Sequence, residues 1–355
     1  MPLPNPLHTL RLRKLQQRSR WLYHVQIALS IGIGLGVLGY LGLQAWAGIR
    51  ELQHSKPTLV MEYLFHAVGF QVVGVGIAAW TWHRILNRAG VNTELSFDFQ
   101  VFTVSAMARK LPGTIWYAVG RLVLYNKVQA PRRLVVSAMF LEIASLALAG
   151  LLSFAIGVLG GGAADIPVFT QIPYLKWFAG FLVCLIVTVV ATTSHWQSWL
   201  KNRFALRANE KSPAIYTKLS WHDTAEWVLA EITVIGLATA VVFSLLRSLE
   251  PTTKISVFLP LYSAFGLAVA LGPLLVWMPS DLGLKDGVVY IVLSQSISSP
   301  IAALLVISWR LVVTTMELLL GVFGGMGLRL IPSPIRFFPT TPQSKSTTDQ
   351  TIHHD

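Results

Sequence analysis

The sequence predicts an all-α polytopic membrane protein with about eight spans and one or two broken or re-entrant helices. Of its 355 residues, 54% are hydrophobic and 12% are charged, which is about half the ~25% charged share of soluble domains. Several apolar runs of eighteen or more residues lack the polar face that a water-soluble helix needs. Lys and Arg also gather in alternate connections between these runs. Together these observations exclude a disordered chain and an ordinary soluble enzyme.

The first apolar run, residues 22–43, follows a leader at 1–20 that is basic and has no acidic residue. This profile is typical of a segment whose N-terminus stays in the cytoplasm. Ala45-Trp46-Ala47 resembles a signal-peptide cleavage site, but the run exceeds the 7 to 15 residues of a signal core. The run therefore predicts an uncleaved first span.

Five further runs are each long enough to cross ~30 Å of hydrocarbon at ~1.5 Å per residue. They cover residues 59–82, 134–158, 175–193, 225–247 and 255–278. The connections 83–133 and 195–220 are rich in Lys and Arg, whereas 159–174 has neither. Because basic loops stay in the cytoplasm, the first two are expected inside and the third outside.

The stretch 279–328 is apolar but interrupted, and the tail 329–355 that follows it is basic. Two crossings in this stretch give eight spans, with both termini in the cytoplasm and the protein in the cell membrane. The tail is rich in Pro, Ser and Thr, so we expect it to be disordered. His353 and His354 share no rigid element with other ligands, so we expect no metal there. No cofactor and no nucleic-acid partner are expected either.

The run GIGLGVLG contains the pattern G-x-G-x-x-G at Gly34, Gly36 and Gly39. In a dinucleotide-binding fold this pattern follows a strand, and none is predicted here. In an apolar run of twenty residues the same glycines allow close approach of helix backbones. The pattern therefore predicts helix packing.

The stretch 97–124 is an apolar approach broken by the sequence R-K-L-P-G and then resumed with aromatic residues. Its candidate headgroup-binding residues are Arg109, Lys110, Pro112, Gly113, Trp116 and Arg121. One interpretation is a broken helix, whose free peptide groups must line protein or a wet cavity. The other is a cytoplasmic loop between interfacial helices, with cations over anionic lipid. Both interpretations place positive charge where phosphate lies.

A second interruption, in residues 277–287, again combines proline, glycine and charges. Its candidate headgroup-binding residues are Pro279, Gly283, Lys285 and Asp286. Two interruptions in comparable places predict two pseudo-repeats, about 59–158 and 225–328, joined by the cytoplasmic loop 195–220. Paired broken helices of this kind indicate the binding site of a transporter.

Four ionisable residues lie inside apolar spans: Glu142, Glu231, Arg310 and Glu317. Each costs at least ~2.5 to 3.5 kcal/mol at the bilayer centre unless it has a partner or water. We expect them to face the protein interior. Structural ion pairing and a direct role with substrate both remain open, and Glu142, Arg310 and Glu317 join the candidate site.

These residues resemble a family. The pattern R-K-L-P-G-x-x-W-x-x-x-G-R runs from Arg109 to Arg121, P-S-D-L-G-L-K-D runs from Pro279 to Asp286, and Glu142 and Glu317 follow the two motifs. The combination, over residues 20–328, resembles the flippase-like membrane family of the lysylphosphatidylglycerol synthase transmembrane region. That family's second motif usually reads P-G-G-x-G-x-R-E, so its charge order is kept here and two of its glycines are not.

The resemblance implies an eight-span helical domain that moves a lipid between leaflets, an aminoacylated phospholipid in the best-known members. The soluble aminoacyl-transferring domain of the full-length synthases is absent from this sequence, so we do not expect this chain alone to make lysyl-lipid. The expected partner is an anionic, aminoacylated or polyprenyl-linked membrane lipid, and a homo-oligomer stays open.

Three functions remain in view. The first is a lipid translocator that holds a headgroup between two helical halves. The second is an enzyme on a lipid-linked substrate, although the sequence shows no recognisable nucleophile, base and orienting group. The third is a scaffold that binds lipid or partner proteins without transport. The motifs favour the first.

Overall fold

The computed structural model describes residues 36, 39–51, 53, 59–108, 115–162, 174–192, 219–272, 284–295 and 297–330. Within these ranges the regular secondary structure is helical, and no strand occurs. Residues 39–51 form a helix that precedes the labelled elements. The others are α2 (Met61–Arg88), α3 (Leu95–Ala108), α4 (Ile115–Asn126), α5 (Arg132–Gly157), η1 (Val158–Gly162), α7 (Leu175–Ala191), α9 (Trp221–Leu249), η2 (Ile255–Val257), α10 (Phe258–Leu271), α11 (Leu284–Leu293) and α12 (Ser299–Leu330).

Four of the described helices, α2, α5, α9 and α12, are long and apolar enough to cross a membrane. Helices α2, α5 and α9 coincide with three of the runs expected from the sequence, and α12 lies in the interrupted stretch 279–328. The four helices indicate insertion into a bilayer. Two shorter apolar helices, α7 and the η2–α10 segment, coincide with two more. The expected count of eight crossings is not confirmed, because α10 has 14 residues and α11 only 10. At ~1.5 Å per residue these lengths fall short of ~30 Å.

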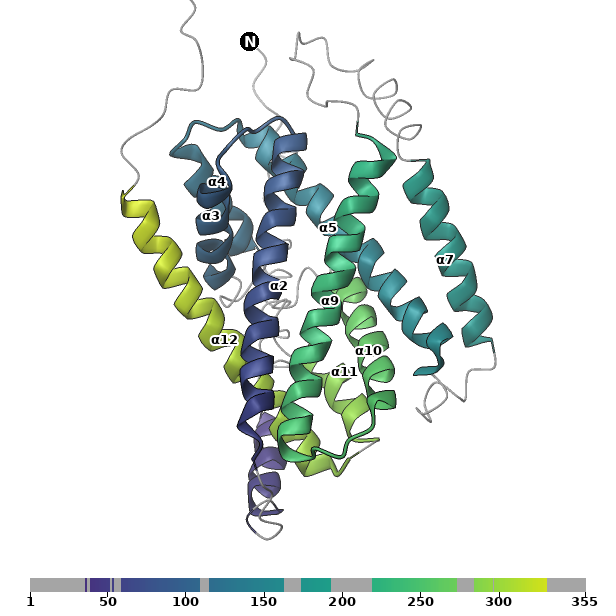
Figure 1. Ribbon diagram of the computed structural model, residues 1–355. Helices are drawn as coiled ribbons and strands as arrows, with labels where there is room; N and C mark the ends of the chain where they lie inside the picture. Colours follow the sequence, from purple (N-terminus) through teal and green to yellow (C-terminus); the bar gives the residue numbers. More distant parts are fainter. Residues whose placement is uncertain are drawn as a thin grey trace, which may run out of the picture.

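The long helices α2 and α9 lie antiparallel at the centre of the bundle (Figure 1). The backbone amide of Val60, before α2, donates to the carbonyl of Ser248 near the end of α9, at 3.0 Å. At the other end of the pair, Arg88 contacts the Asp223 carboxylate at 2.8 Å. Ser220 and Asp223 form a capping box, which satisfies orphan amides and fixes the start of α9.

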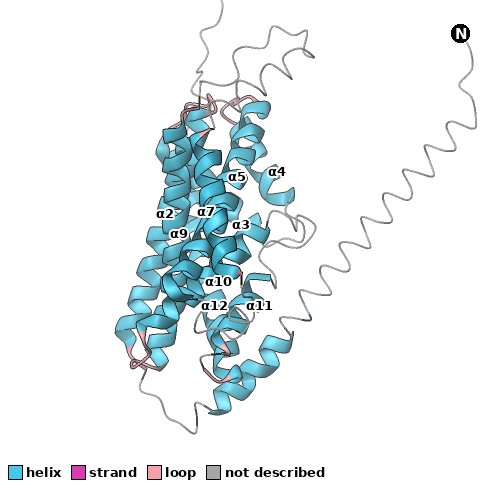
Figure 2. Ribbon diagram, turned by 90° about the vertical axis from the view of Figure 1, so that its right-hand side faces the viewer, coloured by secondary structure: helices cyan, strands magenta, loops and turns pink. Residues whose placement is uncertain are grey.

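Two helical hairpins enter the bundle from opposite ends. In Figures 1 and 2, α3 and α4 occupy the upper half of the bundle and α10 and α11 the lower half. Asp98 bonds to Tyr125, and Ser105 to Arg121, so α3 and α4 are antiparallel. The chain therefore reverses direction between α3 and α4. Residues 109–114, which join these helices, lie outside the described residues.

Each hairpin packs on a long helix of the other half, α3 on α12 and α10 on α5. The α5–α10 contact is made by glycine backbones, because a Cβ on Gly150 would meet the backbone of Gly266 and Ala270 at 2.7 to 2.8 Å. In the α3–α12 contact, glycines of α12 instead meet side chains of α3. A Cβ on Gly324, for example, would meet the hydroxyl of Thr103. The backbones of α5 and α10 therefore approach each other closely, whereas α3 and α12 are in contact through side chains of α3.

The helix over residues 39–51 packs on the rest through Leu41 and Ala45, which belong to the main hydrophobic core. A Cβ at Gly36 or Gly39 would meet no described atom within 4 Å, so the packing predicted from the glycine-rich run stays a prediction, and Gly34 lies outside the described residues. Close packing occurs one turn or more later, at Gly48, against the backbone of Pro300.

Candidate functional site

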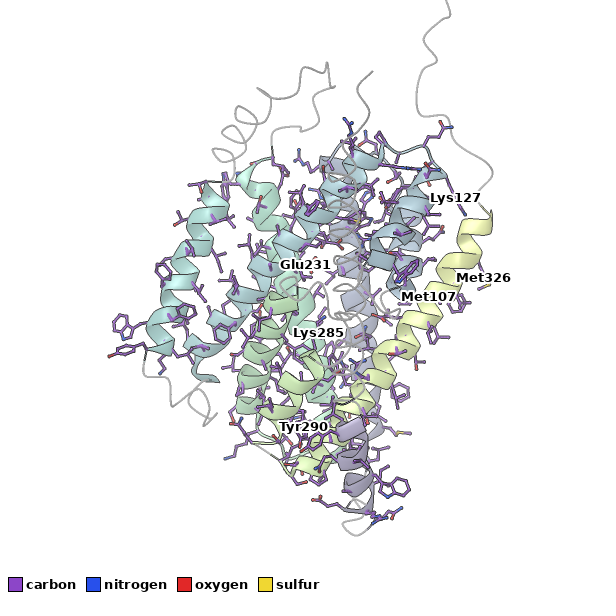
Figure 3. All side chains as sticks on the ribbon, turned by 180° about the vertical axis from the view of Figure 1, so that it is seen from behind. Met107, Lys127, Glu231, Lys285, Tyr290 and Met326 are labelled. Atoms are coloured by element: carbon purple, nitrogen blue, oxygen red, sulfur yellow. The ribbon has the colours of Figure 1, made fainter. Side chains whose placement is uncertain are left out.

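A cavity of about 240 Å³ lies in the middle of the bundle, between α2, α3, α5, α9, α10, α11 and α12. Figure 3 shows two of its charged residues, Glu231 and Lys285, between the two ends of the bundle, which Lys127 and Tyr290 mark. The charged residues that line the cavity are Glu142, Glu231, Lys285, Asp286, Arg310 and Glu317. Charged side chains at the mid-height of apolar helices are costly, so this group is the best candidate for a functional site.

Glu142, on α5, reaches the cavity wall as half of an ion pair with Arg121 of α4. Two guanidinium nitrogens of Arg121 bond its two carboxylate oxygens at 2.5 and 3.0 Å. The Tyr117 hydroxyl donates to the same carboxylate at 3.1 Å. This two-point contact is the geometry in which an arginine binds a carboxylate most strongly.

Arg121 itself is sealed away from the cavity. Its side chain is fully buried, and its guanidinium carbon lies 3.6 Å from the ring centroid of Trp82 and 4.2 Å from that of Tyr117. Aromatic faces attract a cation, most strongly where water is excluded. Arg121 therefore neutralises Glu142 from behind, and the carboxylate alone reaches the cavity.

A second ion pair joins Asp286 of α11 to Arg310 of α12. Asp286 is buried, whereas the Arg310 side chain is 20% exposed. Both residues line the cavity, as does the neighbouring Lys285. In this half the cation faces the cavity, the reverse of the arrangement around Glu142.

The cavity wall combines charged side chains with a larger apolar part. Four carboxylates and two cations line it, and Arg121 compensates one of the carboxylates from behind. Gln71, Thr103 and Thr314 add uncharged polar groups to the same wall. Apolar side chains such as Phe70 and Phe265 complete it. This mixture suits a ligand that has both charged and apolar parts.

A buried network around Asp98 holds the α3–α4 hairpin to α2. The Asp98 carboxylate accepts from the hydroxyls of Thr93 and Tyr125 at 2.7 Å each and lies 2.6 Å from Nδ1 of His83. Trp82 donates to Tyr125 at 2.7 Å. If His83 is neutral with the proton on Nδ1, its Nε2 can accept from Asn87, 2.9 Å away. The network satisfies every one of these buried polar groups, so it orients the hairpin.

Five residues of the sequence-based site come together in the cavity: Glu142, Lys285, Asp286, Arg310 and Glu317. Arg121 lies directly behind Glu142. Trp116 is 48% exposed and is not part of the lining. The remaining six lie outside the described residues: Arg109, Lys110, Pro112, Gly113, Pro279 and Gly283.

The sequence-based site missed Gln71, Glu231 and the Asp98 network. Glu231 was noted as an acid inside a span, and its lining position is the kind that such acids are expected to take. Gln71 is the only amide in the run 59–82, a signal of the same kind. Asp98 lies in the connection 83–133, which the sequence places in the cytoplasm, yet its side chain is fully buried.

In the part of the chain that the structure describes, no three His, Cys, Asp or Glu side chains are grouped so as to hold a metal ion. Comparison with known proteins adds no identification: no family model matches this chain, and no curated protein matches it.

Proposed function

We propose that this protein is a membrane-inserted lipid translocator, whose central cavity carries a lipid headgroup between leaflets. The observation that carries the proposal is the cavity of about 240 Å³, lined by six charged residues at the mid-height of long apolar helices. Charges at that depth are costly, and in membrane proteins they mark the paths of polar substrates.

The helix lengths support six crossings and two half-depth hairpins. The crossings are the first run and helices α2, α5, α7, α9 and α12. The hairpins α3–α4 and α10–α11 enter from opposite faces and return. In this arrangement every connection stays on the side that its charge predicts. The α10–α11 hairpin returns to the face from which it enters, just as two successive crossings would. Both termini stay in the cytoplasm, and the protein lies in the cell membrane.

The order of the elements supports an inverted repeat. In each half a long helix is followed by two short antiparallel helices and then by a second long helix: α2 to α5 in one half, α9 to α12 in the other. The packing partners correspond as well, since α3 lies on α12 and α10 on α5. Inverted repeats with discontinuous helices at the midplane are a common architecture of secondary transporters.

The chemistry of the cavity supports a headgroup as cargo. Moving a phospholipid across a bilayer is slow because its headgroup must lose water, and an unpaired charge in hydrocarbon is very unfavourable. Carboxylates, cations and amide groups along one wall replace the lost hydrogen bonds. The acyl chains can remain in the surrounding lipid throughout.

The resemblance to the flippase-like family of the lysylphosphatidylglycerol synthase transmembrane region points to the same function. Four of the residues that carry the resemblance belong to the cavity lining: Glu142, Lys285, Asp286 and Glu317. We therefore propose a phospholipid, or another lipid with a phosphate-bearing headgroup, as the substrate class.

Leaflet exchange in vesicles tests the proposal. The purified chain is reconstituted with a trace of phospholipid that carries a fluorophore on its headgroup, and an impermeant reductant bleaches the outer leaflet. Wild-type protein should increase the bleached fraction from about one half towards completeness. Lys285→Ala removes a cation from the cavity and should abolish this increase. Lys176→Ala, on an exposed turn of α7, is the matched control and should not.

Protein-free vesicles supply the baseline. A wild-type protein that bleaches no more than this baseline would overturn translocation. Chemical conversion of the labelled lipid without any exchange would favour the enzyme instead.

A further inference from the structure

The two halves of the protein carry ion pairs at corresponding places. Arg121–Glu142 joins the second short helix of the first half to its last long helix. Asp286–Arg310 joins the second short helix of the second half to its last long helix. The polarity is opposite, because the short helix provides the cation in the first half and the carboxylate in the second.

Access to the two arginines differs as well. Arg121 is enclosed by the rings of Trp82 and Tyr117 and has no exposed side-chain surface. Arg310 lines the cavity, and a fifth of its side chain is accessible. An anion that entered the cavity could therefore reach Arg310, but it could not reach Arg121 unless the aromatic rings moved.

Two more donors lie on the same wall as Arg310. Lys285 precedes Asp286 on α11 and lines the cavity. Trp309 also lines it, and its indole N–H is buried without an acceptor among the described residues. A buried tryptophan N–H usually has a hydrogen-bond partner, so this donor points to an acceptor supplied by a ligand.

We infer that Lys285, Trp309 and Arg310 form an anion subsite, at which the phosphate of a lipid headgroup replaces Asp286 as the partner of Arg310. This inference rests on the proposed function and deepens it by naming the part of the headgroup that the second half of the cavity recognises. Arginine suits phosphate because its planar guanidinium can donate two parallel hydrogen bonds.

Exchange of partners explains how a buried cation can bind and release an anion. Leaving a buried charge without a partner is strongly unfavourable, so an arginine that is bare in the empty state would destabilise the protein. Asp286 holds Arg310 while the subsite is empty, and phosphate takes over when it arrives. Arg310 keeps an anionic partner throughout.

The other charged groups that face the cavity are carboxylates: Glu142, Glu231 and Glu317. They lie on α5, α9 and α12 and would repel a phosphate that approached them. The cations on α11 and α12 thus fix the place of the phosphate within the cavity. The cation paired with Glu142 is Arg121, which is fully buried, so an incoming phosphate could not replace Glu142 as it replaces Asp286.

Binding to the purified full chain, in neutral detergent micelles, tests the subsite apart from transport. The probe is a short-chain phosphatidylglycerol, with inorganic phosphate and a short-chain diacylglycerol as separate arms, and the dissociation constant is measured by calorimetry. Asp286→Asn removes the competitor and should tighten phosphatidylglycerol binding about tenfold, equivalent to about 1.4 kcal/mol. Arg310→Gln should abolish it. Diacylglycerol, which has no phosphate, should not respond to either change.

Glu226→Gln is the matched control, because it removes the carboxylate of an ion pair with Arg84 that does not line the cavity. It should leave the dissociation constant within about twofold. The double variant Asp286→Asn/Arg310→Gln removes both charges of the pair, and its loss of binding at wild-type stability separates recognition from folding.

Tightening by Glu226→Gln equal to that by Asp286→Asn would overturn the subsite, because removal of any negative charge would then suffice. Unchanged binding in Asp286→Asn would overturn it as well. Inorganic phosphate that binds as tightly as the lipid would overturn the assignment to a lipid headgroup. Leaflet exchange is scored separately: a subsite that behaves as expected in a protein without exchange would reject translocation alone.

Discussion

Arg121 and Glu142 join the short helix α4 to the long helix α5 through two hydrogen bonds, at 2.5 and 3.0 Å. The rings of Trp82 and Tyr117 cover the guanidinium. The guanidinium is fully buried, and the carboxylate is 13% exposed. This pair therefore does two things. It anchors the α3–α4 hairpin to the bundle, and it presents a single carboxylate to the cavity.

Replacing Arg121 by Gln should destabilise the protein strongly. The change leaves Glu142 without its cation in a low-dielectric wall, and breaking a buried pair in this way costs about 3 to 5 kcal/mol. The free energy of unfolding, from titration of mixed micelles with dodecyl sulfate, measures the loss. The double variant Arg121→Gln/Glu142→Gln should recover much of it, since no charge is then left alone.

The control for this experiment is an ion pair at the surface. Arg84 and Glu226 are also joined by two hydrogen bonds, at 2.7 and 2.9 Å, but their side chains are 42% and 31% exposed. Exposed pairs contribute about 0.2 to 1 kcal/mol. Arg84→Gln should therefore cost far less than Arg121→Gln. Equal losses would show that burial does not set the strength of the inner pair.

Tyr125→Phe should loosen the α3–α4 hairpin. The Tyr125 hydroxyl accepts from Trp82 and donates to Asp98, and Phe fills the same space without either bond. A buried group left without its partner costs about 1 to 3 kcal/mol. Hydrogen exchange should then rise in residues 95–126 more than in α9. A uniform rise across all helices would mean that the network stabilises the whole bundle rather than the hairpin.

The long helices could be predicted from the sequence because their signal is local. Eighteen or more apolar residues in a row can be read without knowledge of neighbours, and the described helices α2, α5, α9 and α12 lie where such runs occur. The pairs of short helices α3–α4 and α10–α11 could be anticipated only as interruptions of apolar runs. Whether an apolar run crosses or turns back depends on packing such as that of Gly150 on Gly266, which sequence spacing does not contain.

Part of the candidate site could also be predicted from the sequence, because its signal is local as well. Glu142, Arg310 and Glu317 were identifiable because charge is rare inside apolar runs. Arg121 and Asp286 were candidates as well, because they belong to the two interrupted motifs, but the sequence does not show which charges pair, since the partners lie on different helices. Asp98 shows the opposite failure. It lies in a charged connection by sequence, yet Thr93 and Tyr125 enclose it completely.

Opposite insertion of the two hairpins can be tested by labelling cysteines. Cys184 is the only cysteine, so Cys184→Ser gives a background for single replacements. Gln129, between α4 and α5, and Thr252, between α9 and η2, are both exposed. In intact cells an impermeant maleimide should label Thr252→Cys, whereas Gln129→Cys should react only after the membrane is opened. Labelling of both positions from one side would contradict the inverted arrangement.

The seam between α5 and α10 leaves no room for a side chain, and a single methyl group should therefore disrupt it. A Cβ on Gly266 would lie 2.5 Å from the backbone nitrogen of Phe154 and 2.7 Å from the carbonyl oxygen of Gly150. Overpacking of a well-filled core costs about 1 to 3 kcal/mol, and rigid backbone on the opposite side places Gly266→Ala at the upper end of that range. Unfolding in mixed micelles should occur at a markedly lower fraction of dodecyl sulfate.

Gly180→Ala on α7 provides the matched change, because a Cβ there meets no described atom within 4 Å. In a helix with free space alanine is favoured over glycine by about 0.5 to 1 kcal/mol, so this variant should be slightly more stable than wild type. The two substitutions are chemically identical and differ only in what the methyl group meets. Similar stability of both variants would mean that α5 and α10 are not in direct backbone contact, and the lower half of the cavity wall would then have to be assigned to other helices.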